Sequence, residues 1–108
     1  MPYYLYQAAY TPESWAAQIK NPQDIRKRVQ AVTEQNGGRI VGLWYAFGEY
    51  DLIAIGEYPD NVSVATAVVA FAAGGALKAA KTTPLMTIEE GMEVLKRAGG
   101  ADYTPPSS

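Results

Sequence analysis

The chain has 108 residues and a mass of 11.7 kDa, which is the size of one domain. Its formal net charge of −2 argues against a nucleic-acid-binding domain that works by neutralising phosphates. The lack of cysteine excludes disulfides, thiolate metal sites and a cysteine nucleophile, and the lack of histidine removes the most common general base and the usual zinc and haem ligands.

The first third of the chain predicts one strand followed by two helical segments. Residues Tyr3–Tyr10 are rich in tyrosine and predict a strand. Residues 11–20 begin with an N-cap threonine and a proline at the first helical position, which predicts a short helix. Residues 22–35 predict a second helical segment, set off by a kink or break at Pro22, with the basic residues 26–28 on its solvated face. The expected core stripe of this segment is Ile25, Val29 and Val32.

The middle of the chain predicts a hairpin with two apolar faces. Residues 39–47 predict one strand, Gly48 and Glu49 a tight turn, and residues 51–58 the antiparallel partner strand. Alternate side chains of the first strand are expected on opposite faces, with Val41, Leu43, Tyr45 and Phe47 on one and Ile40, Gly42, Trp44 and Ala46 on the other. Antiparallel hairpins often expose one polar face to water, so the apolar second face is expected to need a cover.

The last third predicts a buried helix, an edge strand and an amphipathic helix. Residues 62–73 form an apolar run that ends at Gly74, which predicts a helix buried on most sides. Residues 76–86 predict a strand, and Pro84 places it at an edge of the sheet or marks its end. Thr87 and the glutamate three residues later form a capping box that opens a final helix to about residue 98. One face of that helix is expected to carry Ile88, Met92 and Leu95.

The order of these elements predicts an α+β fold. Strand, helix, strand, strand, helix and strand form the ferredoxin-like βαββαβ pattern, here with one more helix at the C-terminus. Residues 1–98 are expected to form this single domain and residues 99–108 a flexible tail. Helices would cover one face of a four-stranded antiparallel sheet. A second copy packed sheet on sheet is the simplest cover for the other face, so a homodimer or larger homo-oligomer is expected.

One segment resembles a known family. The sequence FGEYDLIAIGEYPD, residues 47–60, resembles the core of the GYD domain family, whose glycine-tyrosine-aspartate signature is matched by Gly48, Tyr50 and Asp51. Further likenesses are Gly37, Gly38, Pro59, Asp60, Thr82 and Thr83. The resemblance covers about residues 3–98 and implies a ferredoxin-like fold that pairs as a dimeric α/β barrel. The larger superfamily holds cofactor-independent monooxygenases, isomerases, haem-handling enzymes and ligand-binding regulatory domains, and the lack of histidine argues against the haem-handling branch.

The candidate catalytic residues are Tyr50 and Asp51. In the functional interpretation, Tyr50 orients or protonates a ligand oxygen, and Asp51 holds Tyr50 or accepts a proton. In the structural interpretation, Gly48 forms the turn, Asp51 stabilises it and Tyr50 is an amphipathic plug. The candidate ligand-binding residues are Tyr6, Trp44, Tyr45 and Thr82. Strand aromatics of this kind either line a pocket for a planar ligand or belong to the core and the dimer interface.

No metal or other cofactor is expected. Without histidine, a metal site needs several convergent carboxylates. Asp51 and Glu57 share one strand face, but six residues of strand separate them by about 20 Å, which is too far for one ion. Asp60 is interpreted as a helix cap rather than as a second acid.

Two functions from different classes remain open. The first is a homo-oligomeric α/β-barrel domain that binds a small apolar or aromatic molecule, with cofactor-independent turnover as an extension. The second is a non-catalytic assembly or regulatory module whose sheet faces serve self-association. The longest apolar run, residues 62–73, rises only about 18 Å as a helix, so no membrane span is expected. No secretory signal is recognised in the sequence, and a cytoplasmic protein without a nucleic-acid partner is expected.

Overall fold

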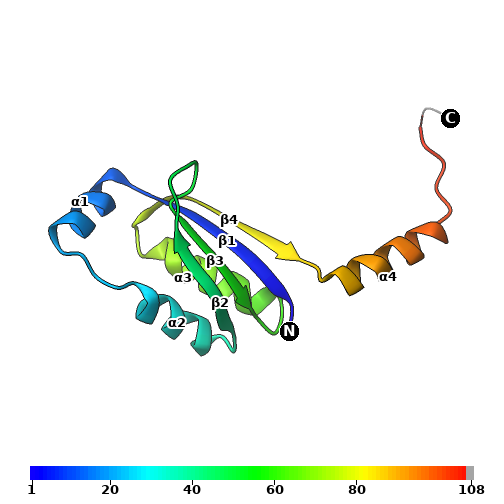
Figure 1. Ribbon diagram of the computed structural model, residues 1–108, viewed down its shortest axis with the longest axis horizontal. Helices are drawn as coiled ribbons and strands as arrows, with labels where there is room; N and C mark the ends of the chain where they lie inside the picture. Colours follow the sequence, from blue (N-terminus) through cyan, green and yellow to red (C-terminus); the bar gives the residue numbers. More distant parts are fainter. Residues whose placement is uncertain (107–108) are drawn as a thin grey trace.

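A four-stranded antiparallel sheet with the strand order β2-β3-β1-β4 forms the centre of the molecule (Figure 1). The computed structural model describes residues 1–106. The strands are β1 (Tyr3–Tyr10), β2 (Arg39–Tyr45), β3 (Leu52–Glu57) and β4 (Leu77–Leu85). The helices are α1 (Pro12–Lys20), α2 (Arg26–Gln35), α3 (Asn61–Ala73) and α4 (Ile88–Gly99). This element order and strand order confirm the predicted ferredoxin-like, α+β fold.

Helices α1, α3 and α4 start where the predicted capping signals lie. The side chains of Thr11 and Asp60 each accept a hydrogen bond from the backbone N–H three residues further on, at 3.1 and 2.9 Å. Thr87 and Glu90 form the predicted capping box at the start of α4. Each of these bonds satisfies an N–H that a helix leaves without an internal partner, which explains where the helices begin. Pro84 lies in β4, an edge strand, as predicted.

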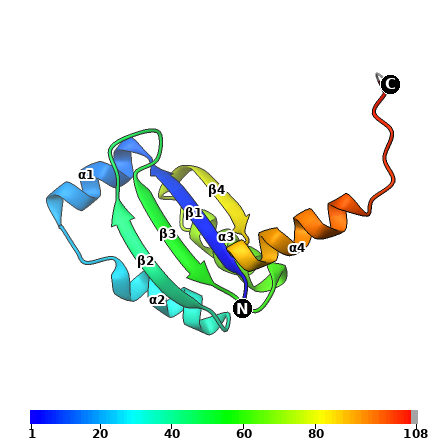
Figure 2. The same ribbon diagram turned by 45° about the vertical axis from the view of Figure 1, so that its right-hand side comes forward.

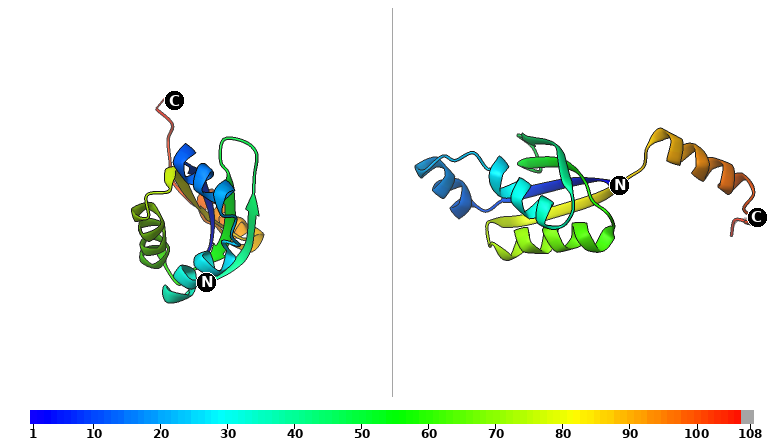
Figure 3. Two further views of the ribbon diagram at one scale, coloured as in Figure 1. Left: turned by 90° about the vertical axis from the view of Figure 1, so that its left-hand side faces the viewer. Right: turned by 90° about the horizontal axis from the view of Figure 1, so that it is seen from below.

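Helices α2 and α3 pack on one face of the sheet, and α1 lies at its end on the same side (Figure 3). Two clusters of buried side chains hold these layers together. One joins Tyr4 of β1 to Val64 of α3, and the other joins Leu52 of β3 to Trp15 of α1. Thr33 of α2 is fully buried, and its hydroxyl lies 3.1 Å from the Tyr58 hydroxyl, so one polar contact ties α2 to the end of β3.

The opposite face of the sheet carries no helix within residues 1–106, and we call it the helix-free face (Figure 3). Tyr4 and Tyr6 point toward α3, so Leu5 between them points to the other side. The strand register then places these residues together on the helix-free face: Tyr3, Leu5, Gln7, Gly42, Trp44, Ile53, Ile55, Glu57 and Thr83. The sheet therefore has two apolar faces, as the sequence predicts.

The predicted side-chain alternation along β2 holds from Gly42 to Tyr45 and is wrong at Ile40. A bulge between Ile40 and Gly42 shifts the register, so Ile40 pairs with Gly56 and Leu43 with Ala54. Both β3 partners face the helices, and so do Ile40, Leu43 and Tyr45. The Trp44 side chain keeps its predicted place on the other face, together with Gly42.

The predicted start of the second helical segment is also wrong. Helix α2 begins at Arg26, so residues 22–25 are not part of it. Asp24 accepts a hydrogen bond from the backbone N–H of Arg26 at 3.0 Å and pairs with its guanidinium at 2.6 Å. This local pairing, rather than Pro22 in the first helical turn, starts the helix.

The two strands of the hairpin are shorter than predicted. Strand β2 ends at Tyr45 instead of residue 47, and β3 spans 52–57. The backbone N–H of Ala46 donates to the carbonyl of Asp51 at 2.8 Å and closes the connecting loop.

Helix α4 extends away from the sheet, as Figures 1 and 2 show. Residues 101–105 after it have no helix or strand, and the last two residues of the predicted tail, 107–108, lie outside the described residues. Within residues 1–106, none of the helices combines the length and the apolar character needed to cross a membrane.

Candidate ligand cleft

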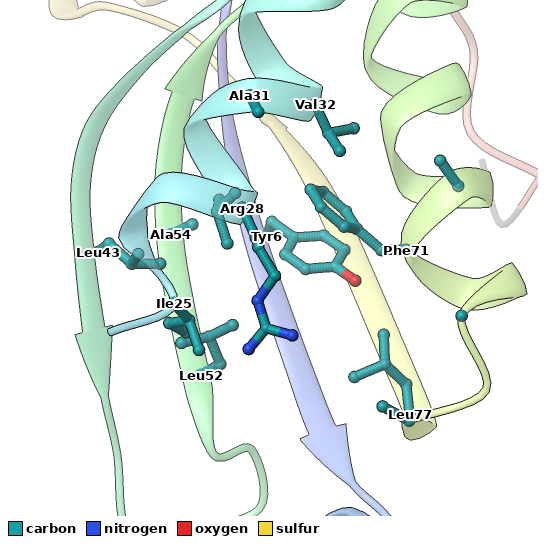
Figure 4. A pocket seen from close by; sticks show the side chains of 14 residues that line it. Tyr6, Ile25, Arg28, Ala31, Val32, Leu43, Leu52, Ala54, Phe71 and Leu77 are labelled. Carbon is teal, nitrogen blue, oxygen red and sulfur yellow. The ribbon is translucent and has the colours of Figure 1, made fainter. Parts of the chain in front are cut away.

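A cleft of about 500 Å³ lies between α2, α3 and the helix-covered face of the sheet (Figure 4). Its walls include the core stripe predicted for the second helical segment and apolar side chains of β2, β3 and α3. Examples of these side chains are Ile25, Val29, Val32, Leu43, Leu52 and Phe71. The volume lies within the range of about 300–1,000 Å³ typical of small-molecule sites, which are mostly apolar with a few polar groups.

Tyr6 of β1 places one of these polar groups in the cleft. Its ring packs against Phe71, with ring centroids 5.6 Å apart, and its hydroxyl lies among the side chains that line the cleft (Figure 4). That hydroxyl is buried and has no hydrogen-bond partner among residues 1–106. Burial raises the pKa of Tyr6 to about 12, so the hydroxyl stays protonated at neutral pH and can donate a hydrogen bond.

Arg28 of α2 supplies the other polar group (Figure 4). Its side chain lines the cleft while remaining accessible to solvent. Arg26 on the same helix is paired with Asp24, whereas Arg28 forms no salt bridge with the described residues. No aspartate or glutamate within residues 1–106 lines the cleft, so its electrostatic character is positive at one place and neutral elsewhere.

The candidate catalytic residues lie outside this cleft. The Asp51 carboxylate accepts a hydrogen bond from the backbone N–H of Tyr10 at 2.9 Å, and the Asp51 N–H donates to the carbonyl of Ala8 at 2.9 Å. Both bonds hold the end of β1, where the pairing with β4 shifts register after Ala9. Tyr50 precedes Asp51 in the loop between β2 and β3 and is half-buried.

The four candidate ligand-binding residues are spread over the sheet. Only Tyr6 lines the cleft. Tyr45 lies beside Trp15, with ring centroids 6.4 Å apart, and Thr82 lines a separate depression under α3. Trp44 lies on the helix-free face and is 54% exposed. The sequence interpretation missed Arg28, because a charged residue in a basic stretch is normally interpreted as exposed to solvent. Its position directly before Val29 of the predicted core stripe is the signal that could have found it.

The helix-free face has an apolar centre and a charged rim. The indole of Trp44 lies directly over Gly42, and a Cβ at position 42 would overlap it. At the rim, a hydrogen bond from Tyr3 and the Arg39 guanidinium, 3.0 Å away, lower the pKa of Glu57. Apolar centres with polar rims are typical of protein interfaces.

Helix α4 carries a second uncovered apolar surface. Ile88 is 81% exposed and Leu95 is 67% exposed, and Met92 lies between them on the same predicted stripe. No group of three or more acidic residues in the described part of the chain is placed to hold a metal ion.

The architecture defines a ferredoxin-like fold, and the comparisons with known proteins agree. Residues 4–95 match the GYD domain family, so the chain belongs to that family and the predicted resemblance is confirmed. The chain is 28% identical over 78 residues to the "glutamine synthetase and cystathionine beta-lyase binding protein" of Thermus thermophilus, an alignment that covers 72% of this chain and 82% of the relative.

Among solved structures, the fold is similar to the crystal structure of MtbAldR, with a TM-score of 0.52 and 14% sequence identity. The match covers 80% of this chain and 52% of the other, so the chain spans about half the length of that protein. At this identity the likeness concerns the fold alone.

Proposed function

We propose that this protein is a homodimeric binding module that holds a small apolar or aromatic molecule in the cleft between α2, α3 and the sheet. The observation that carries the proposal is the cleft of about 500 Å³, with its apolar walls and two polar groups. Protein interiors are close-packed, so an open space of this size contributes no packing to the stability of the fold. Its volume is suited to a small-molecule ligand.

Binding is better supported than turnover. Within residues 1–106, the cleft walls contain one phenol and one guanidinium and no carboxylate that could serve as a base. The Asp51 carboxylate is engaged with the backbone of β1. Turnover at Tyr50 and Asp51 stays a prediction, and ligand binding that is unchanged in both Tyr50→Phe and Asp51→Asn would contradict a role for these residues.

The helix-free face supports the homodimer. A lone subunit would leave the apolar centre of this face, including Trp44, in contact with water. A second copy packed sheet on sheet would cover it and produce the dimeric α/β barrel that the family resemblance implies. In that arrangement the clefts lie on the outer, helix-covered sides, so one dimer has two independent sites.

The test of the cleft uses N-phenyl-1-naphthylamine, an uncharged dye that fluoresces in apolar sites. Ala70→Phe introduces a ring into the cleft, and Ala72→Phe adds the same ring to an exposed position of α3 outside it. We expect the wild type and Ala72→Phe to bind the dye equally, and Ala70→Phe to bind it at least roughly tenfold more weakly. Equal binding by all three proteins, or no binding by the wild type, would contradict the proposal.

A second candidate function is the binding of another protein, and the uncovered stripe of α4 favours it. The Thermus relative is named for binding two enzymes, glutamine synthetase and cystathionine beta-lyase. Titration of the full chain and of a chain ending at residue 87 against each purified enzyme tests this function. Binding that needs residues 88–108 supports it, and the absence of binding to both enzymes by the full chain counts against it.

A further inference from the structure

The polar groups of the cleft share one property: both are donors. The guanidinium of Arg28 has donors only, and the Tyr6 hydroxyl keeps its proton at neutral pH and has no acceptor among residues 1–106. A buried polar group without a partner is rare in native structures and calls for an explanation. A ligand that brings acceptor oxygens into the cleft supplies one.

We infer that the ligand is an apolar or aromatic carboxylate, held by Arg28 at its charged end and by the Tyr6 hydroxyl beside it. This inference rests on the proposed function and names the chemical class of its ligand. Figure 4 shows the guanidinium and the hydroxyl in the same part of the cleft, with apolar side chains around them.

The charge of the site decides in favour of a carboxylate over a phosphate. Within residues 1–106, one guanidinium is the only charged group in the cleft walls, which matches a single negative charge. A guanidinium also forms paired hydrogen bonds with the two oxygens of a carboxylate. The apolar walls, among them Leu52 and Phe71, then require an uncharged hydrocarbon body.

The first experiment compares two probes that differ only in the end group. 4-Butylbenzoate carries the carboxylate, and 4-butylbenzamide has the same shape without the charge. We expect calorimetry on the wild-type chain to show roughly 10- to 100-fold tighter binding of the benzoate, the range for hydrogen bonds that involve a charged group. Equal affinity for the two probes would overturn the inference.

Variants then test which residues cause the preference for the benzoate over the benzamide. Arg28→Gln should abolish the preference for the benzoate over the benzamide, and Arg28→Lys should restore part of this preference because the charge returns without the planar fork. Lys27→Gln is the matched control, since it removes the same charge from the same helix at an exposed position outside the cleft walls. Tyr6→Phe should weaken benzoate binding several-fold.

The outcomes separate the inference from the proposed function. If the uncharged dye and the benzamide bind but Arg28→Gln leaves benzoate affinity unchanged, the cleft is a binding site and the carboxylate assignment is wrong. If neither probe nor the dye binds the wild type, both proposals fall. An equal loss of benzoate affinity in Lys27→Gln and Arg28→Gln would show a general effect of helix charge and would also overturn the inference.

Discussion

An acidic substitution on each side of the sheet should separate subunit folding from self-association. Ile53 lies on the helix-free face between Gln7 of β1 and Trp44 of β2. Leu43 faces the helices and packs on the buried cluster around Leu52. We expect Ile53→Asp to dissociate the dimer and leave the monomer folded, and Leu43→Asp to unfold the subunit.

The magnitudes follow from burial and symmetry. A two-fold interface contains each residue twice, and each buried isoleucine contributes about 1.5–3 kcal/mol. Ile53→Asp should therefore cost the dimer about 3–6 kcal/mol, a rise in Kd of roughly 100- to 10,000-fold, before the added cost of an unpaired buried carboxylate. Leu43→Asp should lower the free energy of unfolding by about 2–5 kcal/mol.

Sedimentation equilibrium at micromolar concentration measures the first effect, and urea denaturation of the monomeric variants measures the second. Val62→Asp, at an exposed site on α3, is the control for adding one negative charge. A wild-type monomer at micromolar concentration would refute the reasoning. So would an Ile53→Asp variant that associates as tightly as the wild type.

Three further predictions concern single polar groups. Tyr6→Phe should raise the free energy of unfolding of the ligand-free chain by about 1 kcal/mol, because it removes a buried hydroxyl without a partner; a decrease in urea denaturation would mean that the hydroxyl is bonded in solution. Thr33→Val should lower it by about 1–3 kcal/mol, with part recovered by adding Tyr58→Phe; a double-mutant cycle with no coupling would contradict this. Asp51→Asn should lower it by about 1 kcal/mol, since the Tyr10 N–H loses a charged acceptor; unchanged stability with lost ligand binding would instead favour a functional Asp51.

Local signals in the sequence account for most of the fold. The strand of residues 3–10 and the capping signals at Thr11, Asp60 and Thr87 act within a few residues of themselves, so the chain around them decides the outcome. The start of α2 is harder to predict from the sequence, because two local signals compete there. Pro22 is compatible with a first helical turn, but the pairing of Asp24 with Arg26 places the start four residues later.

The bulge in β2 and the site depend on partners far along the chain. No residue next to Val41 indicates that two residues of β2 will oppose one of β3, and the shift places Ile40 on the same face as Leu43 and Tyr45. The cleft depends on the separation of α2 and α3, which no single segment determines. Arg28 could have been suspected from its place between Ile25 and Val29, yet only the packed fold shows that its side chain reaches the cleft.

The small residues of the cleft walls explain why the space exists at all. Ala54 on β3, Ala70 on α3 and Gly74 directly after α3 are small residues that line the cleft, and the last two are exposed at its rim. If the gap served no ligand, a larger residue there would add buried apolar contact without loss of function. Ala70→Phe should therefore raise the free energy of unfolding by about 1 kcal/mol while it weakens dye binding, the opposite signs expected when a cavity is kept for function. A variant that loses stability and dye binding together would mean that the ring distorts the fold, and the cleft would then have to be tested at Gly74 instead.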